Sequence, residues 1–183
     1  MKKKIIFAIA LLLCIGLLFA ACIGGGPAPS VPQDERTYVP TDELPAGFAG
    51  FSLQLYETHT FEPWWVEDGW FRVGCEDVGA FVMHIGQLPD IGMTAEEYIA
   101  EMAAERSEDG LEFTYEPPTA DFPFFSLTRF DTGETGKQMQ AFARDNEQGG
   151  LFYVTILLDS DDWEEGHGPR LLNALANMEI IVA

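Results

Sequence analysis

The chain has 183 residues and is strongly acidic, with 30 Asp and Glu against 10 Lys and Arg and a formal net charge of −20. This length suits one domain with a well-filled core and makes a second domain unexpected. The negative surface repels nucleic acid and anionic lipid headgroups, so we exclude a nucleic-acid partner.

The N-terminal segment combines charge, an apolar run and a cysteine. Three lysines at positions 2–4 precede an apolar run over 5–21, and small residues come directly before Cys22. The segment resembles a prokaryotic lipoprotein signal peptide. This is the pattern of an export signal with a processing site, so we expect residues 1–21 to be removed and Cys22 to receive lipid, although Phe19 stands where Leu is usual. The alternative is an uncleaved membrane helix, because the run approaches spanning length. In both cases we expect an extracytoplasmic domain, anchored to the cell membrane.

Two further regions follow the signal. Residues 22–47 are rich in Gly and Pro, which predicts a lipidated Cys22 followed by a flexible linker. Residues 48–183 are expected to form a single domain. Cys14 leaves with the signal, so Cys75 is the one free thiol of this domain and an internal disulfide is excluded. Acidic neighbours raise the pKa of Cys75, and we interpret it as a buried structural thiol.

Apolar periodicity predicts seven strands in this domain. Three precede the first helix, at residues 51–56, 70–75 and 80–85. Four follow it, at residues 111–115, 125–130, 138–144 and 151–158. The last of these is almost wholly apolar, so we expect a central strand covered on both faces.

The first helix has the clearest signals in the chain and is predicted over residues 94–107. Thr94 and Glu97 have the spacing of a capping box. An apolar stripe at helical spacing predicts the buried face. The stripe consists of Ala95, Tyr98, Ile99, Met102 and Ala103.

A second helix is predicted near the C-terminus. Asp161 as N-cap and Glu164 as its partner again fit a capping box. Pro169 interrupts the pattern, so either a short turn ends near Glu165 or the main helix starts with Pro169 at its first position.

The segment LFYVTILLDSDDWEE, residues 151–165, resembles the last strand and last-helix start of the PsbP-like family. The order of elements is similar over residues 51–181. That family includes the extrinsic photosystem protein, Mog-type proteins and many prokaryotic lipoproteins, and this chain resembles the lipoprotein branch. Asn177 and Met178 replace the family's usual Ser-Phe. The resemblance implies an α+β fold, an antiparallel β-sheet flanked by helices in an α/β/α sandwich, used for docking more than for chemistry.

The densest acidic cluster is a candidate cation site. Asp159, Asp161 and Asp162 lie within four residues and are followed by two glutamates. Hard divalent cations bind several carboxylate oxygens at once, which would suit a cation-binding protein or a metal-dependent hydrolase. The alternative is helix capping, because carboxylates stabilise the positive end of the helix dipole.

The histidines give no metal motif. His59, His84 and His167 are widely separated, whereas zinc motifs contain close ligand pairs. We therefore interpret each as structural or solvated, although folding could bring two together.

An aromatic segment over residues 61–71 is the candidate binding surface. It contains Phe61, Trp64, Trp65 and Trp70. Such side chains can stack on sugars or dominate a protein interface, and the alternative is that they pack under the sheet. An exposed Trp64 or Trp65 is expected, because neighbours in an extended chain point opposite ways.

These observations predict a non-enzymatic interaction module held at the membrane by the lipid on Cys22. The sequence shows no catalytic constellation, phosphate loop or dinucleotide fingerprint. We expect a protein or small-ligand partner and no cofactor, with a divalent cation as the alternative. Carbohydrate binding through the aromatic segment is the other alternative.

Overall fold

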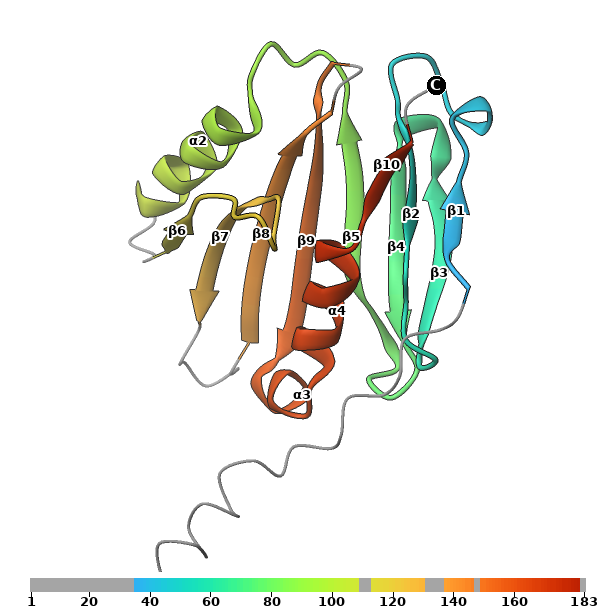
Figure 1. Cartoon of the computed structure of the whole chain (residues 1–183). Helices are drawn as coiled ribbons and strands as arrows, with labels where there is room; N and C mark the ends of the chain where they lie inside the picture. The colour runs from blue at the N-terminus through green and yellow to red at the C-terminus, as the bar shows by residue number, and fades with distance from the viewer. Residues whose placement is uncertain (1–34, 109–112, 131–136, 147–148, 182–183) are drawn as a thin grey trace, which may run out of the picture.

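The structure is a computed structural model that describes residues 35–108, 113–130, 137–146 and 149–181 (Figure 1). The predicted signal peptide, Cys22 and the first part of the predicted linker lie outside these residues. Within them, no helix has both the length and the apolar character needed to cross a membrane.

Strands dominate, with 44% of the described residues in strands and 25% in helices. The described strands are β1 (Thr37–Val39), β2 (Gly50–Leu53), β3 (His59–Trp65), β4 (Trp70–Cys75), β5 (Ala80–Leu88), β6 (Thr114–Glu116), β7 (Phe125–Phe130), β8 (Lys137–Asp145), β9 (Leu151–Asp159) and β10 (Glu179–Ile181). The described helices are α2 (Ala95–Glu108), α3 (Ser160–Glu164) and α4 (His167–Ala176), with short 3-10 helices η1 (Thr41–Glu43) and η2 (Val66–Asp68).

The strands form two antiparallel sheets. The larger sheet has seven strands in the order β3-β4-β5-β9-β8-β7-β6. The smaller sheet has the order β1-β2-β10. The smaller sheet and α4 pack on one face of the larger sheet, and α2 packs on the opposite face at the β7-β8 end (Figure 1).

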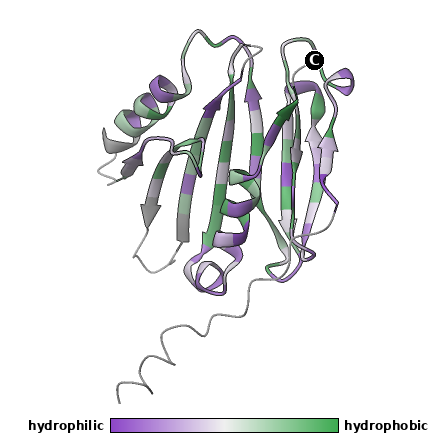
Figure 2. Cartoon of the chain, in the orientation of Figure 1, coloured by the Kyte–Doolittle hydropathy of each residue, from purple (hydrophilic) through white to green (hydrophobic). Residues whose placement is uncertain are grey.

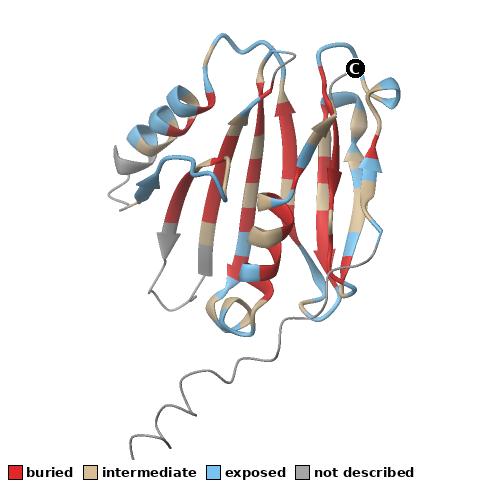
Figure 3. Ribbon diagram, viewed as in Figure 1, coloured by how far each residue is buried: buried red, intermediate tan, exposed pale blue. Residues whose placement is uncertain are grey.

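The main core lies between the two sheets and α4. Phe51 of β2 meets Phe71 of β4 edge to face, with ring centroids 5.1 Å apart, and meets Phe152 of β9 at 5.6 Å. Figure 2 shows apolar residues along β5 and β9, and Figure 3 shows much of both strands buried. A smaller cluster includes Ala95 and Ile99 of α2 on the opposite face. Burial stabilises the fold by about 1.5–3 kcal/mol for each large apolar side chain.

The expected fold class, an α+β sheet flanked by helices in an α/β/α sandwich, is wrong. The chain is mostly antiparallel β, with two sheets and only three short helices in the described residues. A second sheet takes the place of a full helical layer, because segments near both ends of the domain pair with β2. The ten-residue α4 shares that face with the small sheet.

The described structure includes the last part of the predicted linker, residues 22–47. Residues 37–39 form β1 and pair with β2. Arg36 donates to Oγ of Ser52 at 2.9 Å and forms a salt bridge with Glu179 at 3.3 Å, so this segment also contacts β10. A strand of three residues beside a proline carries no periodic signal, which is why composition alone indicated a linker throughout.

The predicted capping box of the first helix is confirmed. The hydroxyl oxygen of Thr94 accepts a hydrogen bond from the N–H of Glu97 at 3.2 Å, and the Glu97 carboxylate accepts one from the N–H of Thr94 at 2.9 Å. These bonds satisfy backbone donors that have no partner within the helix. α2 accordingly starts at Ala95.

For the second helix, the alternative of a short turn that ends near Glu165 is confirmed, because α3 covers Ser160–Glu164 and Glu165 is its C-cap, whereas the predicted N-cap at Asp161 is wrong. Asp159, not Asp161, precedes α3, and it makes no side-chain capping bond. The chain then turns at Gly166, with a φ of 97°, and α4 begins at His167. Pro169 is the third residue of α4 instead of the first; it is tolerated there because the first-turn N–H groups have no partner within the helix.

The strand over 151–158 is central, as predicted, since β9 lies between β5 and β8. The prediction that both faces of this strand are buried is wrong for the second half of β9. Leu157 is 50% exposed, because α2 packs over the β7-β8 end and leaves this part of the opposite face open.

Candidate metal centre

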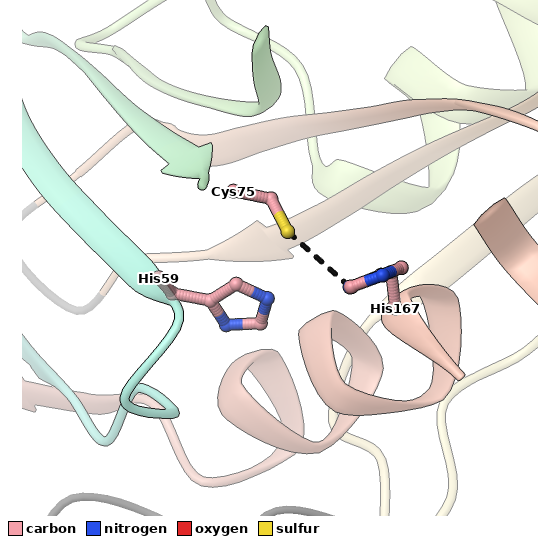
Figure 4. Close-up of side chains that lie close together, drawn as sticks. All are labelled: His59, Cys75 and His167. Carbon is pink, nitrogen blue, oxygen red and sulfur yellow. Dashed lines mark hydrogen bonds between the residues drawn. The ribbon is translucent and has the colours of Figure 1, made fainter. Parts of the chain in front are cut away.

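Two histidines and a cysteine meet at the edge of the main core: His59, Cys75 and His167 (Figure 4). His59 is the first residue of β3, Cys75 is the last of β4, and the register places the two directly opposite each other. Directly paired residues of antiparallel strands project from the same face. His167, the first residue of α4, comes from much later in the chain and completes the group.

The potential ligand atoms of this group are close together and shielded from water. They all lie within 4.8 Å of one another, and Sγ of Cys75 is 3.2 Å from Nδ1 of His167. The exposed fractions are 3% for His59, 2% for Cys75 and 4% for His167. Donor atoms bound to one ion at about 2.0–2.3 Å lie roughly 3.5 Å apart. Small side-chain movements are therefore enough to enclose an ion.

His59 is the unusual member of the group. Both ring nitrogens are buried, and neither has a hydrogen-bond partner among the described residues. Burial lowers the pKa of His59 to about 4, and the electrostatic influence of the nearby His167 and Arg170 adds smaller contributions in the same direction. The ring is therefore neutral near pH 7, and one of its nitrogens carries a free lone pair. Buried polar atoms without a partner are rare, and an absent ion is one of their explanations.

The contacts of His167 assign its tautomer. Nη1 of Arg170 lies 3.5 Å from Nδ1 of His167, and a guanidinium group can only donate. Nδ1 is therefore the unprotonated nitrogen, and the thiol of Cys75 donates to it. Loss of the thiol proton would leave a sulfur and an imidazole nitrogen side by side, each with a lone pair.

Cys75 is a protonated thiol when the group is empty. Burial raises its pKa, and backbone hydrogen bonds from Val78 and Asp77 partly offset this shift. A thiol that is 2% exposed with a raised pKa is a poor nucleophile. The same backbone groups would stabilise a thiolate bound to a cation.

The ligand set fits a soft or borderline metal ion. Thiolate and imidazole together suit copper and zinc, whereas calcium and magnesium require oxygen ligands. The group His59, Cys75 and His167 is the one such cluster of metal-ligating side chains in the part of the chain that the structure describes.

The predicted acidic site is not assembled. Asp159 and Asp161 are exposed and Asp162 is half-buried, around the start of the five-residue α3. Within the described residues, none of the three belongs to a group of ligand atoms close enough to share an ion. Consecutive side chains at a strand end and in a first helical turn point in different directions. The three carboxylates are therefore close in sequence but do not converge on one point.

The predicted aromatic surface divides between different environments. Phe61 stacks on Phe71 at 5.8 Å and packs against the main core. Trp64 stacks on Trp65 at 4.0 Å and lies 5.3 Å from His84, between ring centroids. Trp65 is 55% exposed, so the expectation of one exposed indole is met. Residues 61–65 of the segment lie in β3, and the strand register shifts between Pro63 and Trp65. Because of this irregularity Trp64 and Trp65 stack on each other, so the expected reason for an exposed indole, that neighbours point opposite ways, is wrong.

Sequence reasoning treated the three residues of the metal group separately. The buried thiol at Cys75 is confirmed. The spacing rule for zinc motifs misses the group, because its ligands come from two strand ends and a helix start. Recognising β3 and β4 as a hairpin would have paired His59 with Cys75, but no local signal places His167 beside them.

Searches of the sequence against protein-family models and against curated proteins found no match. The likeness to the PsbP-like family stays a prediction. Fold and site together define a mostly β domain with a buried cluster of one cysteine and two histidines.

Proposed function

We propose that this protein is a membrane-anchored, extracytoplasmic metal-binding module that holds one Cu(I) ion through His59, Cys75 and His167. The supporting observation is the imidazole of His59, buried with both nitrogens unpartnered beside a thiol and a second imidazole. The tether is the lipid predicted on Cys22.

The number and softness of the ligands favour Cu(I). Thiolate is a soft ligand that selects Cu(I) or zinc, and structural zinc almost always has four protein ligands. The cluster offers three within the described chain. Three ligands of this type suit Cu(I), which needs no fourth.

The charge of the surroundings favours a monovalent ion. Nη1 of Arg170 lies 3.5 Å from Nδ1 of His167, so a positive charge already borders the site. Cu(I) with the Cys75 thiolate is neutral, whereas Zn²⁺ with one thiolate leaves a further positive charge beside the guanidinium. An uncompensated buried charge is costly, so the neutral pair is the more stable occupant.

A buried site of this kind suits binding more than catalysis. All three side chains are at most 4% exposed, which leaves a bound ion little access to substrate. We therefore assign the domain to holding a soft metal ion outside the cytoplasm.

An anaerobic competition titration tests this proposal. The full chain in detergent, freed of metal and reduced, is titrated with Cu(I) in the presence of the chelator bicinchoninate. We expect one ion per chain, and loss of this binding in Cys75→Ser and His59→Gln. His84→Gln is the matched control, because His84 lies outside the cluster, and it should bind as the parent does.

Two results would overturn the proposal. Equal Cu(I) binding by Cys75→Ser and by the parent would show that the cluster does not bind the ion. If Zn²⁺ binds more tightly than Cu(I), with the same dependence on His59 and Cys75, the metal site is supported but the assignment of Cu(I) is wrong.

A further inference from the structure

A cavity of about 490 Å³ lies on the same sheet face as the metal group but toward the opposite edge of the large sheet. It lies over β6, β7 and β8 beside α4, whereas His59 and Cys75 come from β3 and β4. Its lining residues are Glu116, Pro117, Thr119, Phe122, Ser126, Thr128, Gln140, Phe142 and Leu172. The volume is in the range of small-molecule sites.

The floor of the cavity is more polar than the adjacent strand β9, whose residues on this face, Phe152, Val154, Ile156 and Leu158, are all apolar and buried. Register pairs Glu116 with Ser126 and Thr128 with Gln140, so these side chains project together from neighbouring strands. Ser126, Thr128 and Gln140 are all buried. Small-molecule sites combine apolar walls with a few polar groups that orient the ligand, and this cavity has both.

Gln140 is the most informative residue of this floor. It is 6% exposed, and its Oε1 atom has no hydrogen-bond partner among the described residues. A buried amide oxygen of this kind requires a donor, and its position in the cavity lining means that a bound molecule can supply one.

The remaining lining residues define the chemistry of that molecule. Glu116 places a carboxylate at the cavity, and no Lys, Arg or His is among the described residues that line it. Phe122 and Phe142 supply aromatic walls, with ring centroids 5.5 Å apart. Acceptors and aromatic faces favour a cationic donor with an apolar body, and the carboxylate repels anions.

We propose that this cavity binds a small organic ammonium ion. Its N–H groups donate to Oε1 of Gln140 and to the carboxylate of Glu116, while its apolar part packs between Phe122 and Leu172. The inference is independent of the metal centre, because the two sites share no residue.

Calorimetry with 2-phenylethylammonium tests the inference on the full chain in detergent. We expect saturable binding that is weakened about tenfold or more in Glu116→Gln and in Gln140→Leu, as expected for the loss of a charged or buried hydrogen bond. Glu62→Gln is the matched control, since Glu62 pairs with Arg72 away from the cavity, and it should stay within about twofold of the parent.

Two related probes separate the charge from the apolar body. Neutral 2-phenylethanol and anionic 3-phenylpropanoate should bind at least about tenfold more weakly than the ammonium ion. The inference is overturned if the ammonium ion shows no saturable binding, if 3-phenylpropanoate binds as tightly, or if Glu116→Gln binds as the parent does. Glu116 is exposed, so that variant remains informative even if Gln140→Leu fails to fold.

Discussion

The sulfur of Cys75 lies 3.2 Å from Nδ1 of His167, although 92 positions separate the two residues in the chain. One belongs to the last position of β4 and the other to the first position of α4. A metal ion shared by them would connect the start of α4 directly to the edge of the large sheet. Metal binding and the docking of α4 are therefore linked in this fold.

This linkage predicts that Cu(I) stabilises the folded protein. Because the unfolded chain lacks the assembled site, free Cu(I) at about 1,000 times its dissociation constant should raise the free energy of unfolding by about 4 kcal/mol. Anaerobic thermal unfolding measures the shift. Cys75→Ser should show no shift and His84→Gln should show the full one; a shift of the same size in Cys75→Ser would contradict the prediction.

The depressed pKa of His59 predicts that the metal-free protein loses stability in mild acid. The unfolded residue takes up a proton near pH 6.5, whereas the folded residue does so only near pH 4, so the unfolded state binds more protons between these values. Stability therefore falls as the pH falls through this window. Between about pH 7.5 and about pH 5 the loss from this residue is about 2 kcal/mol.

Urea unfolding at a series of pH values measures that loss. His59→Phe should be less sensitive to pH over the same window, because the residue that titrates has been removed. An unchanged pH dependence in this variant would show that other groups, such as His84, account for it. The range above about pH 5 is chosen because most carboxylates stay ionised there.

The sequence predicted elements well where apolar periodicity was clear. β4 and β7 have the predicted bounds, residues 70–75 and 125–130. In β4 the buried Phe71 and Val73 alternate with the half-buried Trp70 and Arg72. β3 was missed because Pro63 and the adjacent Trp64 and Trp65 obscure the alternation. β1 and β10 were missed because three residues are too few to show a period.

The site was less predictable than the strands, for a physical reason. A binding cluster depends on which elements dock, and only tertiary packing brings His167 to the β3-β4 hairpin. The acidic cluster at 159–165 was prominent in sequence, yet a short exposed helix disperses it. The residues that converge, His59 and Cys75, are single residues with no local motif.

Gln87 and Gln140 are both buried and should respond oppositely to substitution. Oε1 of Gln87 accepts from the N–H of Ala49 at 2.8 Å, and Nε2 donates to the carbonyl of Ala49 at 2.9 Å. Gln87→Leu leaves two buried backbone groups without partners, which should cost about 2–4 kcal/mol. Gln140→Leu removes an amide oxygen that has no partner, and it should change stability by less than about 1 kcal/mol.

Urea unfolding of the two leucine variants makes this comparison. The variants have the same chemical change in strands of the same sheet, so their difference reports the hydrogen bonds and not the loss of an amide. Equal destabilisation would mean that Gln140 is satisfied within the fold, which would also weaken the inference of a ligand in its cavity.

Gly168 contributes no ligand, but we predict that the metal group needs a residue without a side chain at this position. A Cβ atom at this position would lie 2.3 Å from the ring of Trp163, because α3 and α4 pack closely at this point. Gly168→Ala should therefore separate the two helices and displace the adjacent His167. We expect a loss of about 1–3 kcal/mol in stability, as for overpacking in a core, and about tenfold weaker Cu(I) binding.

A double mutant separates this packing effect from a general loss of fold. Trp163→Ala removes the ring that the new methyl group would meet, so the pair Gly168→Ala with Trp163→Ala should bind Cu(I) as tightly as Trp163→Ala alone. The two substitutions must then be non-additive, since residues in contact share their interaction energy. Additive losses of Cu(I) affinity would show that the close approach of Gly168 to Trp163 does not position His167.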